Sequence, residues 1–232
     1  MSSKNVEPQD NAEKIEEGAI EALSKSEKYI QDNKKTILIV TIAVIVLIAG
    51  FFAYKNLYRK PHIAKAEEAI YKAEAYFGVD SFAIALNGNG ADVQGFLSII
   101  NDYKNTPSAN VAHAYAGICY YNLGEYENAI KHLEKFKSKD TMASPSIYGL
   151  IGDCYVNLGK TSEGIKYFEQ AAKRADNDLL SPLYLLKAGV AYEALGDTEK
   201  ARSSYQTIID KYYASNFLGE AQKHLQALEL SK

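Results

Sequence analysis

The sequence has no tryptophan and only two cysteines, two methionines and five prolines among its 232 residues. Two cysteines cannot supply the disulfide framework of a small secreted fold. Neither sign of charge dominates, because 26 Lys and Arg stand against 29 Asp and Glu, a net charge of −3. Nucleic-acid binding requires a basic surface, so we expect no nucleic-acid partner. Apolar residues make up 47% of the chain, which is an ordinary globular proportion.

The motifs of enzymes and metal sites are also missing. The four histidines form no His-x3-His pair, which argues against a zinc-binding helix, and no Gly-x-Ser-x-Gly elbow occurs. Gly159-Lys160-Thr161 imitates the end of a phosphate loop, but the glycine needed five residues earlier is Cys154. We therefore expect no catalytic residue, no metal and no cofactor. An enzyme with scattered active-site residues is kept as a remote alternative.

Charge is absent from one long apolar stretch, residues 36–54, which is flanked by Lys35 and Lys55. As a helix this stretch rises about 28 Å, close to the roughly 30 Å of membrane hydrocarbon. The preceding segment is too long for a signal peptide, and Phe51 breaks the small-residue rule for cleavage after Ala53. We predict an uncleaved, single-pass transmembrane helix in contact with the lipid bilayer. A buried core helix is the alternative.

The polar tail, residues 1–35, holds six Lys and eight Asp or Glu. Apolar residues at steps of three and four predict a helix from about residue 11 to 33, with a partly ordered, solvated tail as the alternative. Basic residues on the two sides of the apolar stretch are almost balanced, with a slight lean toward a cytosolic C-terminal part. Because this rule weakens for long domains, both topologies stay open.

Three stretches beginning at Gly117, Gly152 and Gly189 align without gaps at offsets of 35 and 37 residues. Each opens with Gly-x-x-Tyr, which places a small residue and an aromatic on one helix face. A Leu-Gly pair follows, whose glycine supplies a left-handed helix end. A small residue and a larger one four positions later come next, as Ala129 and Leu133, Gly164 and Phe168, and Ala201 and Tyr205. The pattern predicts closely packed helix pairs.

A single pair cannot bury both of its faces, so the units must stack. Asp197 or Thr161 is expected to cap a second helix. Further helices are predicted over 61–77, 93–103 and 216–230, with a turn at 87–90. The predicted organisation is a tail (1–35), a transmembrane helix (36–54), a juxtamembrane helix with an irregular first repeat (55–109), three repeats (110–213) and a capping helix (214–232). The predicted fold class is all-α, a solenoid of helix pairs.

This pattern resembles the tetratricopeptide repeat, whose signature is Trp-x2-Leu-Gly-x2-Tyr, then Ala-x3-Phe, then Pro. The first glycine and the tyrosine are matched in all three units, by Gly117, Gly152 and Gly189 and by Tyr120, Tyr155 and Tyr192. The tryptophan position departs from the signature, with His113, Tyr148 and Leu185. The resemblance covers roughly residues 110–213, under half the chain. It implies an α-solenoid that binds other proteins or peptide segments.

In this repeat family the first helix of each unit lines a concave groove. The resemblance, applied by register, places these residues there: Val111, Ala114, Ile118, Tyr121, Asn122, Ser146, Gly149, Asp153, Val156, Asn157, Leu183, Leu186, Val190, Glu193 and Ala194. None is Lys or Arg, which argues against capture of a carboxylate tail. We expect an apolar peptide or partner helix there, with Asn122 and Asn157 bonding to its backbone. Filling of the groove by neighbouring helices is the alternative.

Cys119 and Cys154 occupy the same position in adjacent units. Equivalent points on packed helices lie about 8–10 Å apart, beyond the roughly 7 Å between α-carbons that a disulfide permits. We predict two free, buried thiols that behave as small apolar residues. His113 falls at a packing position and is predicted to be a core residue. Most of the 18 tyrosines are likewise expected to pack at repeat positions.

The layout of a short tail, one anchor and a repeat domain resembles bacterial inner-membrane repeat proteins, notably the ancillary SecYEG translocon subunit family. The resemblance implies a non-enzymatic, membrane-tethered scaffold with a periplasmic repeat domain near the translocon, chaperones and newly translocated chains. A cytosolic orientation, and a coordinator of envelope assembly or cell division, are the alternatives.

Overall fold

The computed structural model describes residues 8–230, and the chain divides into two compact units that meet between Pro61 and His62. All regular elements within this range are helices, apart from a single β-bridge between Gly88 and Gln94. The all-α prediction is therefore confirmed.

The N-terminal unit contains the helix α1 (Pro8–Ala53) and the π-helical segment η1 (Tyr54–Arg59). The predicted tail helix and the apolar stretch form one uninterrupted helix, because no proline, glycine or capping residue separates Asn33 from Thr36. By length and composition, the apolar stretch is long enough to cross a membrane, and none of it is buried.

Pro61 accounts for the π-helical segment before it. Proline has no N–H, and its ring clashes with the carbonyl four residues earlier, so a helix must widen or bend there. In η1 the Lys60 N–H accordingly donates to the Lys55 carbonyl, five residues back. The predicted helix 61–77 is confirmed as α2 (Lys60–Phe77).

The C-terminal unit opens with short helices, α3 (Phe82–Asn87) and α4 (Phe96–Asp102). The helix predicted from residue 93 begins only at Phe96, because Gly95 is its N-cap. Gly95 packs against the backbone of the preceding turn so closely that a Cβ would clash there. The predicted turn at 87–90 is confirmed, and Gly88 has a φ of 83°. Rings of Phe77, Phe96 and Tyr115 form the core of this region.

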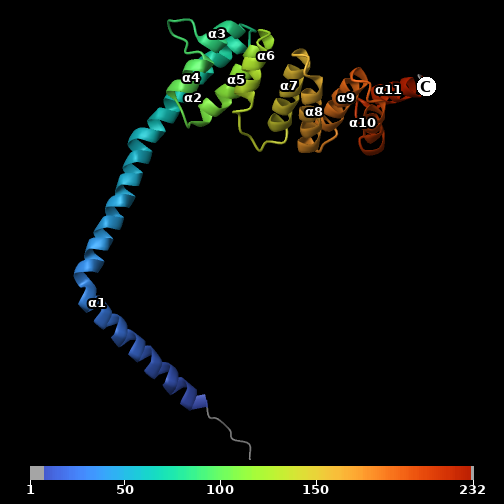
Figure 1. Cartoon of the computed structure of the whole chain (residues 1–232). Coiled ribbons are helices and arrows are strands. Elements are labelled where there is room, and N and C mark those ends of the chain that lie inside the picture. Colours follow the sequence, from blue (N-terminus) through green and yellow to red (C-terminus); the bar gives the residue numbers. More distant parts are fainter. Residues whose placement is uncertain (1–7, 231–232) are drawn as a thin grey trace, which may run out of the picture. The chain divides into compact units, whose positions relative to one another are not determined.

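Three helix pairs and a last helix follow, stacked in chain order (Figure 1). Their bounds are α5 (Pro107–Asn122) and α6 (Tyr126–Leu133), α7 (Ala143–Asn157) and α8 (Thr161–Ala175), α9 (Leu180–Ala194) and α10 (Thr198–Lys211), and α11 (Leu218–Leu230). The predicted left-handed ends are confirmed at Gly124, Gly159 and Gly196, with φ of 78°, 72° and 75°. At each end the residue after the glycine donates its N–H to the carbonyl of the repeat tyrosine.

The predicted packing of each pair is also confirmed. A Cβ on Gly117 would lie 2.5 Å from Leu133, and one on Gly152 would lie 2.6 Å from the Phe168 ring. Gly189 faces the Tyr205 ring in the same way. The glycine of the first helix therefore receives the large side chain of the second, and this contact sets how closely the two helices approach.

Of the two predicted helix caps, one is confirmed and the other is wrong. Asp197 caps α10, since its carboxylate accepts the Lys200 N–H at 3.2 Å. The prediction for Thr161 is wrong, because Thr161 is already the first residue of α8 and Lys160 stands at the N-cap without a side-chain bond. A threonine can accept the free N–H groups of a helix start only from the N-cap position.

The second helix of the first pair is short. α6 has 8 residues, whereas α8 has 15 and α10 has 14. After Leu133 the chain makes a turn and continues without regular structure to α7. The side chain of Asn110 forms two hydrogen bonds with this segment. Its amide nitrogen donates to the Lys137 carbonyl, and its amide oxygen accepts the Lys137 N–H, both at 2.9 Å.

Cys119 and Cys154 are free and fully buried, as predicted. Burial raises the pKa of each thiol to about 12. Their role in the fold is therefore that of small apolar residues.

Candidate protein-binding groove

A largely apolar groove of about 500 Å³ lies along the C-terminal repeats. We call it the α7–α9 groove. Two exposed valines, Val156 on α7 and Val190 on α9, line it, together with Leu183, Ala191 and Ala194. Phe168 of α8, which is only 3% exposed, lies beneath them. Because these side chains come from two successive repeats, the groove exists only when the repeats stack.

The groove contains one ion pair that joins its two walls. Nζ of Lys187 lies 2.8 and 2.7 Å from the two carboxylate oxygens of Asp153. The same ammonium lies 5.7 Å from the centre of the Phe168 ring. The expectation of a groove without Lys or Arg is therefore wrong, but the lysine is neutralised within the groove. A carboxylate tail would have to compete with Asp153 for this cation.

Leu186 lines the groove as expected and Glu193 does not, and both have structural roles. Leu186 is only 6% exposed and belongs to the core that includes Tyr205 and Ile208. Glu193 points to later elements, since it accepts a hydrogen bond from the Tyr205 hydroxyl and contacts Nδ1 of His224 at 2.9 Å. Burial and this carboxylate raise the pKa of Tyr205. Glu193 thus fastens α9 to α10 and α11.

The asparagines expected to bind a partner backbone are bonded within their own helices. Asn122 donates to the Ile118 carbonyl at 2.8 Å, and Asn157 to the Asp153 carbonyl at 2.9 Å. Gly149 faces Tyr184 and is buried, and Ser146 donates its hydroxyl to the Met142 carbonyl. The α5 residues Val111, Ala114, Ile118 and Tyr121 do not line the α7–α9 groove.

Sequence reasoning missed the residues that close one end of the groove. Phe217 and Glu220, at the start of the last helix, belong to its lining. The end helix therefore contributes to one end of the groove, whereas the part between α7 and α9 is lined by the repeats alone. The sequence analysis allowed either an open groove or one filled by neighbouring helices. The structure shows a groove that is partly filled.

A pair of histidines lies in contact outside the groove. Nδ1 of His113 lies 3.2 Å from Nδ1 of His132, and both rings are half-buried. Burial, together with His113, Lys135 and Lys131, lowers the pKa of His132 to about 4. The prediction that His113 packs inside the fold is confirmed in part, because the ring is half-buried against a second histidine.

This pair predicts a loss of stability in mild acid. The unfolded chain binds a proton at His132 near pH 6.5, whereas the folded chain binds it only near pH 4. Stability is therefore fully present above about pH 6.5 and falls as the pH drops toward 4. The urea midpoint should be lower at about pH 5 than at about pH 7.5, and His132→Gln should reduce this difference. An equal drop in the variant would contradict the assignment.

No group of three or more His, Cys, Asp or Glu side chains that could hold a metal ion occurs in the described part of the chain.

Comparison with known proteins agrees with this geometry. Models of the tetratricopeptide repeat match residues 115–140, 145–178 and 184–212. The chain contains tetratricopeptide repeats. The matched segments correspond to the three helix pairs α5–α6, α7–α8 and α9–α10. Tetratricopeptide repeats bind other proteins or peptides, so the groove is a candidate protein-binding surface.

Two solved structures are similar to the chain. A crystal structure of MamA protein is 19% identical, with a TM-score of 0.51, and the match covers 70% of this chain and 85% of that one. A second MamA crystal structure is 22% identical, with a TM-score of 0.40 over 57% of this chain and 86% of that one. No curated protein matches the chain. At this level of identity the first similarity establishes the fold of the tetratricopeptide repeats and no more.

Proposed function

We propose that the protein is a membrane-anchored scaffold whose tetratricopeptide repeats capture an apolar segment of another protein in the α7–α9 groove. One observation carries the proposal. Val156 and Val190 are 38% and 44% exposed on facing walls of an apolar groove whose only cation within the lining is paired. Covering such a surface with an apolar side chain of a partner lowers the free energy of the complex. An anionic ligand would find no unpaired cation there to bind.

The anchor in this proposal is the apolar stretch of α1. Its side chains are exposed, with Leu38 at 60% and Leu47 at 73%. A run of this length is costly to leave in water and matches the thickness of a bilayer. We propose the organisation inferred from the sequence, with residues 36–54 in the membrane and the repeats after them. The layout resemblance supports a periplasmic repeat domain near the translocon and its chaperones.

Site-specific crosslinking in intact membranes tests the groove. A photo-crosslinking residue at Val190 should give crosslinks to apolar segments of a partner, identified by mass spectrometry. Adding Val156→Asp should reduce the yield by about tenfold or more, because an unpaired carboxylate is then buried on binding. Crosslinks to translocon subunits or newly translocated chains would support the translocon role.

Val111 supplies a matched control. It is 37% exposed on α5, almost the same as Val156, but lies outside the groove lining. Val111→Asp should leave the Val190 crosslinks unchanged. Equal loss with both variants, or crosslinks only to lipid, would refute the groove proposal.

A further inference from the structure

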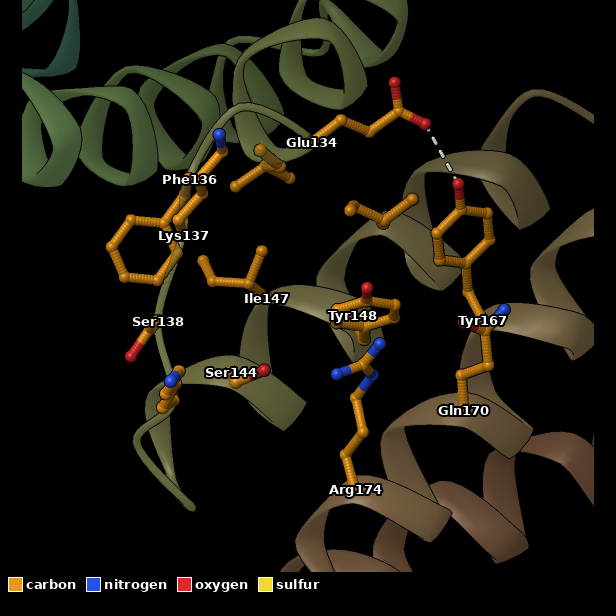
Figure 2. Close-up of a pocket in the computed structure, with 13 residues that line it drawn as sticks. Glu134, Phe136, Lys137, Ser138, Ser144, Ile147, Tyr148, Tyr167, Gln170 and Arg174 are labelled. Atoms are coloured by element: carbon orange, nitrogen blue, oxygen red, sulfur yellow. Dashed lines mark hydrogen bonds between the residues drawn. The ribbon is translucent and has the colours of Figure 1, made fainter.

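A second cavity, of about 660 Å³, lies beside the first half of α7 (Figure 2). It opens where α6 stops at Leu133 and the irregular segment 134–142 begins. A longer α6, comparable to α8 and α10, would continue over this part of α7. The shortened helix therefore leaves part of α7 without the helical cover that the other repeats have. We call this cavity the α6–α7 pocket.

The floor of the α6–α7 pocket is apolar. Leu133, Ile147 and Ile151 line it and are 1%, 9% and 2% exposed. The rings of Tyr148 and Tyr167 stand beside this floor, with their centres 6.0 Å apart. An apolar side chain of a ligand would find buried carbon atoms below it and aromatic faces at its side.

The rim of the pocket is cationic. Lys137, Lys139 and Arg174 belong to the lining, and all three are exposed. Figure 2 shows the guanidinium of Arg174 beside the Tyr148 ring, whose centre is 4.1 Å away. None of these three cations forms an ion pair with a carboxylate of residues 8–230.

The only carboxylate in the lining is already engaged. Glu134 accepts a hydrogen bond from the Tyr167 hydroxyl at 2.9 Å, on the side of the pocket away from Arg174 (Figure 2). The backbone of Lys137 is fixed by its two hydrogen bonds to Asn110. The segment that carries Lys137 and Lys139 is thus held in place by α5, whereas Arg174 stands on α8.

We propose that the α6–α7 pocket binds an acidic segment of a partner protein, in which carboxylates flank an apolar side chain. Carboxylates complement the three cations, and Arg174 forms the strongest type of charge-assisted bond with them. The apolar side chain would cover the floor, which a small anion would leave exposed. The volume lies within the usual range for ligand sites, about 300–1,000 Å³. The pocket and the α7–α9 groove share no lining residue, so each site can fail its test alone.

Fluorescence polarisation with the full chain in detergent micelles tests this site. The probe is a labelled short peptide that alternates glutamate and leucine, compared with peptides that carry lysine for glutamate or serine for leucine. We expect the first peptide to bind, and the other two to bind about tenfold or more weakly. The double substitution Lys137→Glu and Lys139→Glu should lower the affinity for the first peptide by about tenfold or more. Added salt should also lower this affinity. Both substitutions lie outside helices, so the circular dichroism spectrum should not change.

Lys166→Glu with Lys173→Glu is the matched control, because it changes the net charge equally on exposed positions of α8 outside the lining. This variant should bind the first peptide as the original protein does. Equal loss in both double variants would show only a general charge effect and would overturn the proposal. Equal binding of the serine peptide, with full displacement by inorganic phosphate, would show a plain anion site and would also overturn it. Should the first double variant lose helicity, Arg174→Gln makes the same test, with the same loss expected.

Discussion

Replacing Phe168 by alanine should lower the free energy of unfolding by about 3–5 kcal/mol. Phe168 is 3% exposed, fills the space above Gly152, and lies beneath the ammonium of Lys187. Its removal leaves a cavity between α7 and α8 that the helices cannot close, because their backbones already meet at Gly164, where a Cβ would lie 2.9 Å from the Gly152 carbonyl oxygen. Urea unfolding of the full chain, followed by circular dichroism, measures the loss.

The matched control for this change is Tyr213→Ala. Tyr213 is 73% exposed, so its truncation should change the free energy of unfolding by no more than about 0.5 kcal/mol. Phe168 also lines the groove, so Phe168→Ala should weaken partner crosslinking at Val190 as well. A loss below about 1 kcal/mol would mean that the helix pair does not depend on this contact.

Replacing Ile42 and Ile45 together by arginine should release the protein from membranes. Both side chains are exposed, at 52% and 58%, near the middle of the apolar stretch. Each arginine costs about 2.5–3.5 kcal/mol at the centre of an inserted helix. Fractionation with an alkaline carbonate wash should find the original protein in the pellet and the variant in the supernatant.

Ile20→Arg with Leu23→Arg provides the control on the same helix. These side chains are 66% and 60% exposed but lie outside the apolar stretch. The control variant should stay in the pellet, because its arginines remain in water. Release of the original protein by carbonate, or retention of the Ile42 and Ile45 variant, would contradict the anchor.

The repeat contacts could be predicted because they are local to each unit. A glycine in one helix and a large side chain in the next are separated by a fixed number of residues, so alignment of the units exposed the pairs. The end of α6 could not be predicted in this way. Lys135 and Lys137 suit a helix. The chain nevertheless leaves the helix after Leu133, and Asn110, from another helix, binds the backbone of Lys137.

In the groove, too, contacts within one helix could be predicted from the sequence, whereas contacts between separate elements could not. Lys187 could have been found from the sequence, because Leu183, Lys187 and Val190 follow one another at steps of four and three and share a helix face. The role of Glu193 could not, since its partners Tyr205 and His224 come from separate elements. The closure by Phe217 depends on how the last helix docks, which repeat alignment does not describe.

The two buried thiols have a practical consequence for labelling. Thiolate, the reactive form, is scarce at neutral pH when the pKa is about 12. The folded chain therefore resists both alkylation and oxidation at Cys119 and Cys154, whichever compartment surrounds it. A single new cysteine on an exposed site will be the one position that reacts with maleimide, so sidedness can be mapped without first removing the native pair.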